Sequence, residues 1–194
     1  MKTEIKIKTM TITGLLCAIG IIIPIFAPQF VLEPASFTLA SHVPVFIAMF
    51  ISPSVSISVA LLTSLGFLVS GTPIIIVLRA LTHVIFAALG SYMLKKNNNI
   101  LLSLKSTGIF SFLIALVHAA AEVTVVTFYY WGGSMTAYEE KGYLVSVLGL
   151  VGLGTIIHSM IDFGIAVIIW NPLQKIITIP ANAKVKTRAA NSRL

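Results

Sequence analysis

Apolar residues group into six long segments that are separated by short polar or proline-containing breaks. A helix needs about 20 apolar residues to cross the hydrocarbon layer of a membrane, with about 17 as the lower end. By that measure the second and third segments are marginal, and the break between them, Ser52-Pro53-Ser54, is the least secure boundary. We predict helices over approximately Met10 to Pro28, Ser36 to Ser52, Val55 to Gly71, Pro73 to Leu94, Thr107 to Tyr130 and Tyr143 to Trp170.

Basic residues set the expected direction of these six spans. Lysines and arginines concentrate before the first span, in the loop Lys95 to Lys105 and after the last span. Because cytoplasmic loops carry an excess of positive charge, both termini and that loop are predicted to be cytoplasmic. Aromatic residues near span ends, Tyr130 and Trp131 outside and Trp170 inside, are expected at the two membrane interfaces.

Composition supports a membrane protein. Apolar residues make up 57% of the 194 residues and charged residues only 10%, far from a soluble domain. We expect an all-α integral membrane protein with residues 1–180 as one substrate-binding domain. Residues 181–194 form a basic cytoplasmic tail, either disordered or bound to anionic lipid headgroups. The net charge of +7 follows the topology pattern, so no nucleic-acid partner is expected.

Three predicted spans each carry two ionisable residues four positions apart, and such a pair shares one helix face. Charged side chains inside a membrane are costly and are normally retained for a substrate, an ion or a buried partner. They are therefore the candidate functional residues. The pairs are Arg79 with His83, His118 with Glu122, and His158 with Asp162.

Depth along the helices separates these residues into two levels. At about 1.5 Å per residue, Arg79 and His42 lie roughly 9 Å below the outer interface and Glu122 roughly 13 Å below it. Asp162 lies about 12 Å from the inner interface at Trp170, which favours a structural role for it. The outer level predicts a cavity that a small polar molecule enters from outside, with His158 as its floor.

Arg79 is the sharpest candidate, because its planar guanidinium matches a carboxylate or phosphate with two parallel hydrogen bonds. The alternative is an internal Arg79–Glu122 ion pair that satisfies two buried charges. His83 and His118 face the same cavity by their spacing, where a neutral imidazole can hydrogen-bond or stack on a ligand. A structural histidine bonded to a backbone carbonyl is the alternative for each.

Two further features concern partners. Gly14 and Ala18 are small residues four positions apart in the first span, a spacing that lets another helix approach closely in lipid. The chain has no GxxxxGK[ST], HExxH, GxSxG or CxxC motif. It is therefore not expected to be an enzyme, and active transport would need an ion gradient or ATPase partners.

Two segments resemble the substrate-binding S components of energy-coupling-factor vitamin transporters, most of all the niacin-specific group. They are Pro34 to Pro53 (PASFTLASHVPVFIAMFISP) and Val77 to His83 (VLRALTH). The resemblance implies a compact six-helix bundle in a bacterial cell membrane that binds a vitamin near the outer face. It also implies docking on a transmembrane coupling subunit driven by two cytoplasmic ATPases, with Gly14 and Ala18 in the alanine-rich contact motif of the first helix.

For niacin, a pyridine carboxylate, the resemblance implies Arg79 at the carboxylate and a histidine or Glu122 near the ring nitrogen. Tyr130 or Trp131 would line the lid. The expected substrate-binding set is His42, Arg79, His83, His118, Glu122, Tyr130, Trp131 and His158. Neither a cofactor nor a metal is needed for this function. Pantothenate, another carboxylate vitamin, would also use Arg79.

Two other functions remain open. A stand-alone carrier could use His118, Glu122, His158 and Asp162 as a proton relay. An intramembrane metalloenzyme or metal transporter could use the His-x-x-x-Glu and His-x-x-x-Asp pairs as nitrogen and oxygen ligands.

Overall fold

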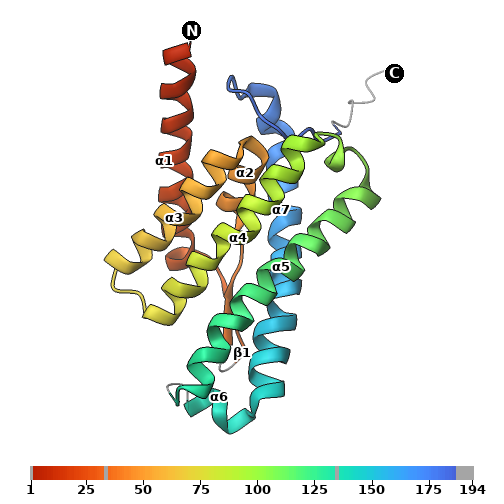
Figure 1. Ribbon diagram of the computed structural model, residues 1–194. Coiled ribbons are helices and arrows are strands. Elements are labelled where there is room, and N and C mark those ends of the chain that lie inside the picture. Colours follow the sequence, from red (N-terminus) through yellow and green to blue (C-terminus); the bar gives the residue numbers. More distant parts are fainter. Residues whose placement is uncertain (1, 33–34, 134–135, 187–194) are drawn as a thin grey trace.

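The computed structural model describes residues 2–32, 35–133 and 136–186, and its long helices are tilted relative to one another (Figure 1). Among the described residues, four helical stretches are long and apolar enough to cross a membrane: α1, α4, α5, and η2 with α7 as one 33-residue helix. The fold is therefore an all-α membrane protein with one added hairpin. Its elements are α1 (Lys2–Phe26), β1 (Gln29–Leu32), β2 (Ala35–Thr38), α2 (Val43–Ile51), α3 (Pro53–Val69), α4 (Ile74–Lys96), η1 (Ile100–Leu102), α5 (Leu104–Trp131), α6 (Thr136–Lys141), η2 (Leu144–Leu153) and α7 (Gly154–Ile176).

The boundaries of α3 and α4 follow local sequence signals. Ser52 caps α3 by accepting a hydrogen bond from the Val55 backbone N–H, and Pro53 takes the first helical position, where it costs no hydrogen bond. Gly71, at a φ of 75°, makes the sharp turn before α4. The predicted breaks at Ser52-Pro53-Ser54 and at Gly71-Thr72-Pro73 are confirmed.

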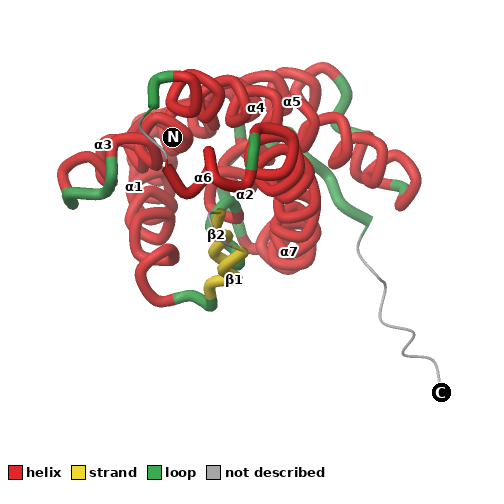
Figure 2. Tube along the Cα trace, turned by 90° about the horizontal axis from the view of Figure 1, so that it is seen from below, coloured by secondary structure: helices red, strands yellow, loops and turns green. Residues whose placement is uncertain are grey.

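The helix predicted over Ser36 to Ser52 is wrong in its first half. Residues up to Thr38 are extended, and β2 pairs antiparallel with β1, Gln29 opposite Thr38 and Leu32 opposite Ala35. The remaining α2 has nine residues, or about 13 Å of helix, which is shorter than a membrane span. Seen from below, the hairpin lies between α1 and α7 (Figure 2).

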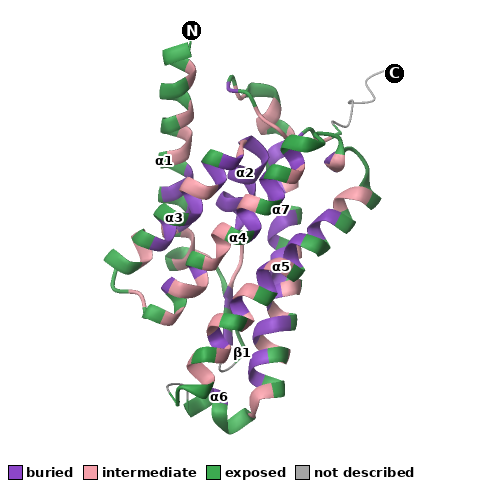
Figure 3. Cartoon of the chain, viewed as in Figure 1, coloured by how far each residue is buried: buried purple, intermediate pink, exposed green. Residues whose placement is uncertain are grey.

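The short helix α2 is the centre of the bundle, and all nine of its residues are buried (Figure 3). Its Phe46 ring packs 5.4 Å from the ring of Phe86 in α4 and 5.2 Å from that of Phe163 in α7. Such tilted and edge-on ring pairs add to the stabilisation from apolar burial. Packing against the neighbouring helices α4 and α7 therefore stabilises this short helix.

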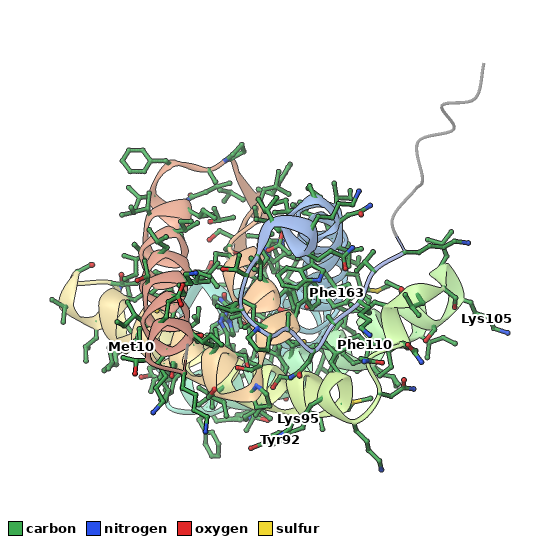
Figure 4. All side chains as sticks on the ribbon, turned by 90° about the horizontal axis from the view of Figure 1, so that it is seen from above. Met10, Tyr92, Lys95, Lys105, Phe110 and Phe163 are labelled. Carbon is green, nitrogen blue, oxygen red and sulfur yellow. The ribbon has the colours of Figure 1, made fainter. Side chains whose placement is uncertain are left out.

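The two ends of the bundle differ in charge. The start of α1, the loop between α4 and α5 and the end of α7 lie at one end, and the α3–α4 turn and α6 lie at the other (Figure 1). Viewed from the first end, Lys105 points outward from the bundle whereas Phe163 lies in its interior (Figure 4). This arrangement agrees with the prediction that the three basic segments lie on the same side of the membrane.

Trp170, expected at the inner membrane interface, is fully buried and donates a hydrogen bond to the Ala183 carbonyl at 3.2 Å. The Ala183 backbone N–H in turn donates to the Phe50 carbonyl at 2.9 Å. The first part of the predicted tail, residues 181–186, therefore packs against α2 and α7. Residues 187–194 lie outside the described residues, so the prediction for them is untested.

Candidate functional site

A cavity of about 370 Å³ opens between the hairpin and helices α1 to α4, toward the end that carries the α3–α4 turn. Its volume lies within the range of small-molecule sites, and most of its wall is apolar. Polar groups are concentrated on the hairpin and on the wall formed by α4, α5 and α7. The polar lining residues are Gln29, Ser36, Thr38, Ser41, His42, Thr63, Ser70, Thr72, Arg79, His83, Glu122, Thr155 and His158.

A buried ion pair between α4 and α5 lies in this wall. Arg79 Nη2 donates to Glu122 Oε2 at 2.9 Å, and Thr155 Oγ1 donates to the same oxygen at 2.7 Å. The Arg79 side chain is 17% exposed and the Glu122 side chain 4%. Arg79 Nε is buried and has no hydrogen-bond partner in the part of the chain that the structure describes. The guanidinium therefore neutralises Glu122, and Arg79 also lines the cavity.

The four histidines of the chain form one cluster around His42, which precedes α2. The His42 ring centroid lies 4.7 Å from those of His83 and His118 and 4.9 Å from that of His158. The two levels expected from helical rise are therefore one site. The depth of Asp162 was counted from Trp170, whereas α7 continues past Trp170 to Ile176.

Asp162 holds the turn that carries His42. Its Oδ1 accepts from the Ala40 backbone N–H at 2.8 Å, and its Oδ2 accepts from the His42 backbone N–H at 2.9 Å and from His42 Nδ1 at 3.0 Å. Ala40 has a φ of 65°, a strained conformation for a residue with a side chain. The Asp162 carboxylate thus joins α7 to the turn after β2 and orients the His42 ring.

Phe37 of β2 forms part of the cavity wall and packs onto α7 where a glycine leaves room. A Cβ built on Gly154 would lie 2.5 Å from Phe37 Cζ, a distance that real Cβ atoms do not reach. The Phe37 ring is also tilted against the His158 ring, with 5.4 Å between the centroids. Gly154 therefore lets the hairpin approach the helix.

We expect Gly154→Ala to destabilise the protein by about 1–3 kcal/mol, the usual cost of overpacking, because the rigid Phe37 ring must move. Gly164→Ala on the same helix is the matched control, since its Cβ would meet nothing within 4 Å. The control should be neutral or stabilising, because alanine favours helix. Thermal unfolding of the two purified variants measures this, and equal melting temperatures would contradict the packing argument.

The cavity lining includes most, though not all, of the residues predicted to bind substrate. His42, Arg79, His83, Glu122 and His158 line it, and His118 does not. His118 lies next to His83 and Glu122, with its Nε2 3.4 Å from Glu122 Oε1.

Tyr130 and Trp131 also do not line this cavity. They pack with Tyr143 near the end of α5, where Trp131 stacks on Tyr143 at 5.7 Å and is 72% exposed.

Sequence reasoning missed several polar residues of the site. Thr155 and Ser159 lie on α7 at helical spacing from His158 and Asp162, so that one face carries all four. This spacing was the signal that could have found them. Ser41 reaches His158 Nε2 at 3.2 Å, and its position next to His42 was a weaker signal.

Gly14 and Ala18 lie on the exposed side of α1, away from the cavity. A Cβ built on Gly14 would meet no atom within 4 Å. The small-residue face is therefore open to another helix.

Among curated proteins, the niacin transporter NiaX of Lactococcus lactis subsp. cremoris (strain MG1363) is 41% identical to this chain over 182 residues. The match covers 93% of this chain and 81% of the relative. No family model matches the chain, and no solved structure matches it.

Proposed function

Because the chain belongs to the family of the niacin transporter NiaX, we propose that it is the membrane-embedded niacin-binding subunit of an ATP-driven energy-coupling-factor transporter. A transport function for niacin follows from the family. The way niacin binds and the coupling to ATPases are what we propose beyond the family relationship. The observation that carries the proposal is the presence of Arg79 in the wall of the cavity.

The carboxylate of niacin is assigned to Arg79. One Nη2–H is used by Glu122, and the remaining N–H groups of the planar fork are available to a second carboxylate. Hydrogen bonds between ionised partners are about twice as strong as neutral ones. The place of Arg79 among the cavity-lining residues supports this assignment.

The pyridine ring is assigned to the apolar part of the cavity. Phe37, Val45, Phe67 and Ile76 line it and suit a flat aromatic ring. The ring nitrogen accepts a hydrogen bond, and Ser41 in the lining carries a hydroxyl that can donate one. Niacin then spans from the polar wall to the hairpin.

The proposed topology has six crossings, with the hairpin and α2 together making the second. The end of the bundle that carries the basic segments faces the bacterial cytoplasm, as the distribution of lysines favours. The cavity then opens toward the outside. The exposed face with Gly14 and Ala18 is assigned to the transmembrane coupling subunit, and two cytoplasmic ATPases supply the energy.

The binding proposal is tested by isothermal titration of the purified protein with niacin, nicotinamide and pantothenate. Nicotinamide is the matched ligand, since it keeps the ring and replaces the carboxylate by a neutral amide. We expect niacin to bind with one site per chain and nicotinamide to bind at least about 10-fold more weakly, because it loses about 1.4 kcal/mol or more of charge-assisted bonding. Equal binding of niacin and nicotinamide would refute the role of the anionic group.

The coupling proposal predicts that Gly14→Leu with Ala18→Leu leaves niacin affinity unchanged and reduces niacin uptake by cells that contain the complete transporter. The larger side chains block close approach of another helix. Leu15→Ala on the same helix is the control. Sustained niacin uptake by vesicles that contain this chain alone would instead support the stand-alone carrier.

A further inference from the structure

Three of the four histidines and one glutamate present their ligand atoms to a common point. Suitable atoms of His42, His83, His118 and Glu122 all lie within 4.8 Å of one another. Three imidazoles and a carboxylate are a ligand set that transition metals such as zinc accept. The residues come from α4, α5 and the turn before α2, so the cluster exists only in the folded protein.

Two of these histidines carry a buried nitrogen without a hydrogen bond. His83 Nε2 and His118 Nε2 have no partner within the described residues, and the His118 side chain is fully buried. They lie 3.6 Å and 3.4 Å from Glu122 Oε1. In a tetrahedral site with bonds of about 2.0–2.1 Å, neighbouring ligand atoms are about 3.3–3.4 Å apart. The spacing of these atoms is therefore close to that of two edges of a zinc tetrahedron.

Outer hydrogen bonds orient two of the histidines, His42 and His118, for coordination. Asp162 accepts from His42 Nδ1, which leaves His42 Nε2 as the nitrogen with a free lone pair. His118 Nδ1 is bonded to Ser159 Oγ at 3.2 Å, which leaves its Nε2 free as well. Metal-binding histidines are typically held in this way, through the other ring nitrogen.

Hydrogen bonds also orient the Glu122 carboxylate for metal coordination. Arg79 and Thr155 both donate to its Oε2, and Oε1 remains directed at the two histidine nitrogens. The charges also permit a cation, because Glu122 and Asp162 together outnumber the single guanidinium of Arg79 when the histidines are neutral. A divalent ion would reverse this balance and make the cavity positive.

We propose that His42, His83, His118 and Glu122 bind one divalent transition metal ion of the zinc class. This metal site is additional to the niacin site expected from the sequence, which needs no metal. A second set, His42 with His158 and Asp162, is less suitable because the Asp162 oxygens are already occupied by three N–H donors. Metal binding needs no niacin, so it stands or falls separately from the proposed vitamin site.

The test uses full-length protein without an affinity tag, stripped with a chelator and dialysed against Zn²⁺ or Co²⁺. We expect one Zn²⁺ per chain by elemental analysis, and a Co²⁺ visible spectrum typical of tetrahedral nitrogen and oxygen ligands. His118→Gln should weaken Zn²⁺ binding by about 100-fold or more, and Ser159→Ala, which loses only the outer hydrogen bond, by about 10-fold.

His158→Gln is the matched control, since it removes a neighbouring histidine outside the proposed set and should leave Zn²⁺ affinity unchanged. Wild-type protein without stoichiometric Zn²⁺ and without a Co²⁺ spectrum would overturn the proposal, and this result needs no variant to fold. Loss of Zn²⁺ in His158→Gln with retention in His118→Gln would also overturn it, in favour of the second set.

Discussion

Arg79→Gln is expected to weaken niacin binding by about 100-fold or more, because it removes both the charge and the planar fork that hold the carboxylate. Titration calorimetry measures the loss. The same change leaves Glu122 as an unpaired charge in a buried site, which costs about 3–5 kcal/mol of folding free energy. A drop in affinity alone would therefore confound binding with stability.

The double variant Arg79→Gln with Glu122→Gln separates the two effects. It restores charge balance in the wall, so its thermal stability should recover toward that of the wild type. Niacin binding should remain lost, since the anion site is still absent. Recovery of binding together with stability would mean that Arg79 serves only to neutralise Glu122, as in the internal ion-pair interpretation.

Asp162→Asn is expected to destabilise the protein by about 2–4 kcal/mol and to weaken niacin binding. The carboxylate accepts three N–H groups from Ala40 and His42, and hydrogen bonds to an ionised acceptor are worth about 1.5–3 kcal/mol each. An amide keeps one oxygen and places an NH₂ group against the remaining donors. The hairpin should then loosen, which limited proteolysis of residues 29–42 and the melting temperature both detect.

Glu4→Gln is the control for this change, because it also converts a carboxylate to an amide. Glu4 pairs with Lys8 at 2.7 Å on the exposed first turns of α1. An exposed pair of this kind contributes about 1 kcal/mol or less. If Asp162→Asn melts no earlier than Glu4→Gln, Asp162 does not hold the turn.

Much of the helical framework could be predicted from the sequence, since its signals are local. Serine and proline at positions 52 and 53 mark the start of α3, and Gly71 marks the turn before α4. Long apolar runs identify α1, α4, α5 and α7 by composition alone. The family resemblance drawn from residues 34–53 and 77–83 is confirmed by the relationship to NiaX.

The hairpin and the short α2 could not be predicted, because contacts distant in sequence determine them. Residues 36–52 are apolar enough for a helix, and although Pro44 marks a helix start near Val43, it does not predict the extended residues before it. The turn at Ala40 instead depends on the Asp162 carboxylate, which is more than a hundred residues away. Packing of Phe37 against Gly154 is a second contact of this kind.

For the site, the four-residue spacing identified the right helix faces but not where those faces meet. Arg79, His83, Glu122 and His158 were found in this way, and the cavity includes them. Helical rise counted from Trp170 separated Asp162 from the other residues, whereas α7 extends beyond Trp170. The resemblance implied Tyr130 or Trp131 at the lid, yet the side on which an aromatic residue packs depends on tertiary structure.

The most direct measurement for the central claim is an experimental structure of the purified protein with niacin bound. Our account predicts the carboxylate within hydrogen-bond distance of the Arg79 guanidinium and the pyridine ring in the cavity beside Phe37. Niacin bound in that cavity with its carboxylate directed away from Arg79, or bound elsewhere on the protein, would contradict it.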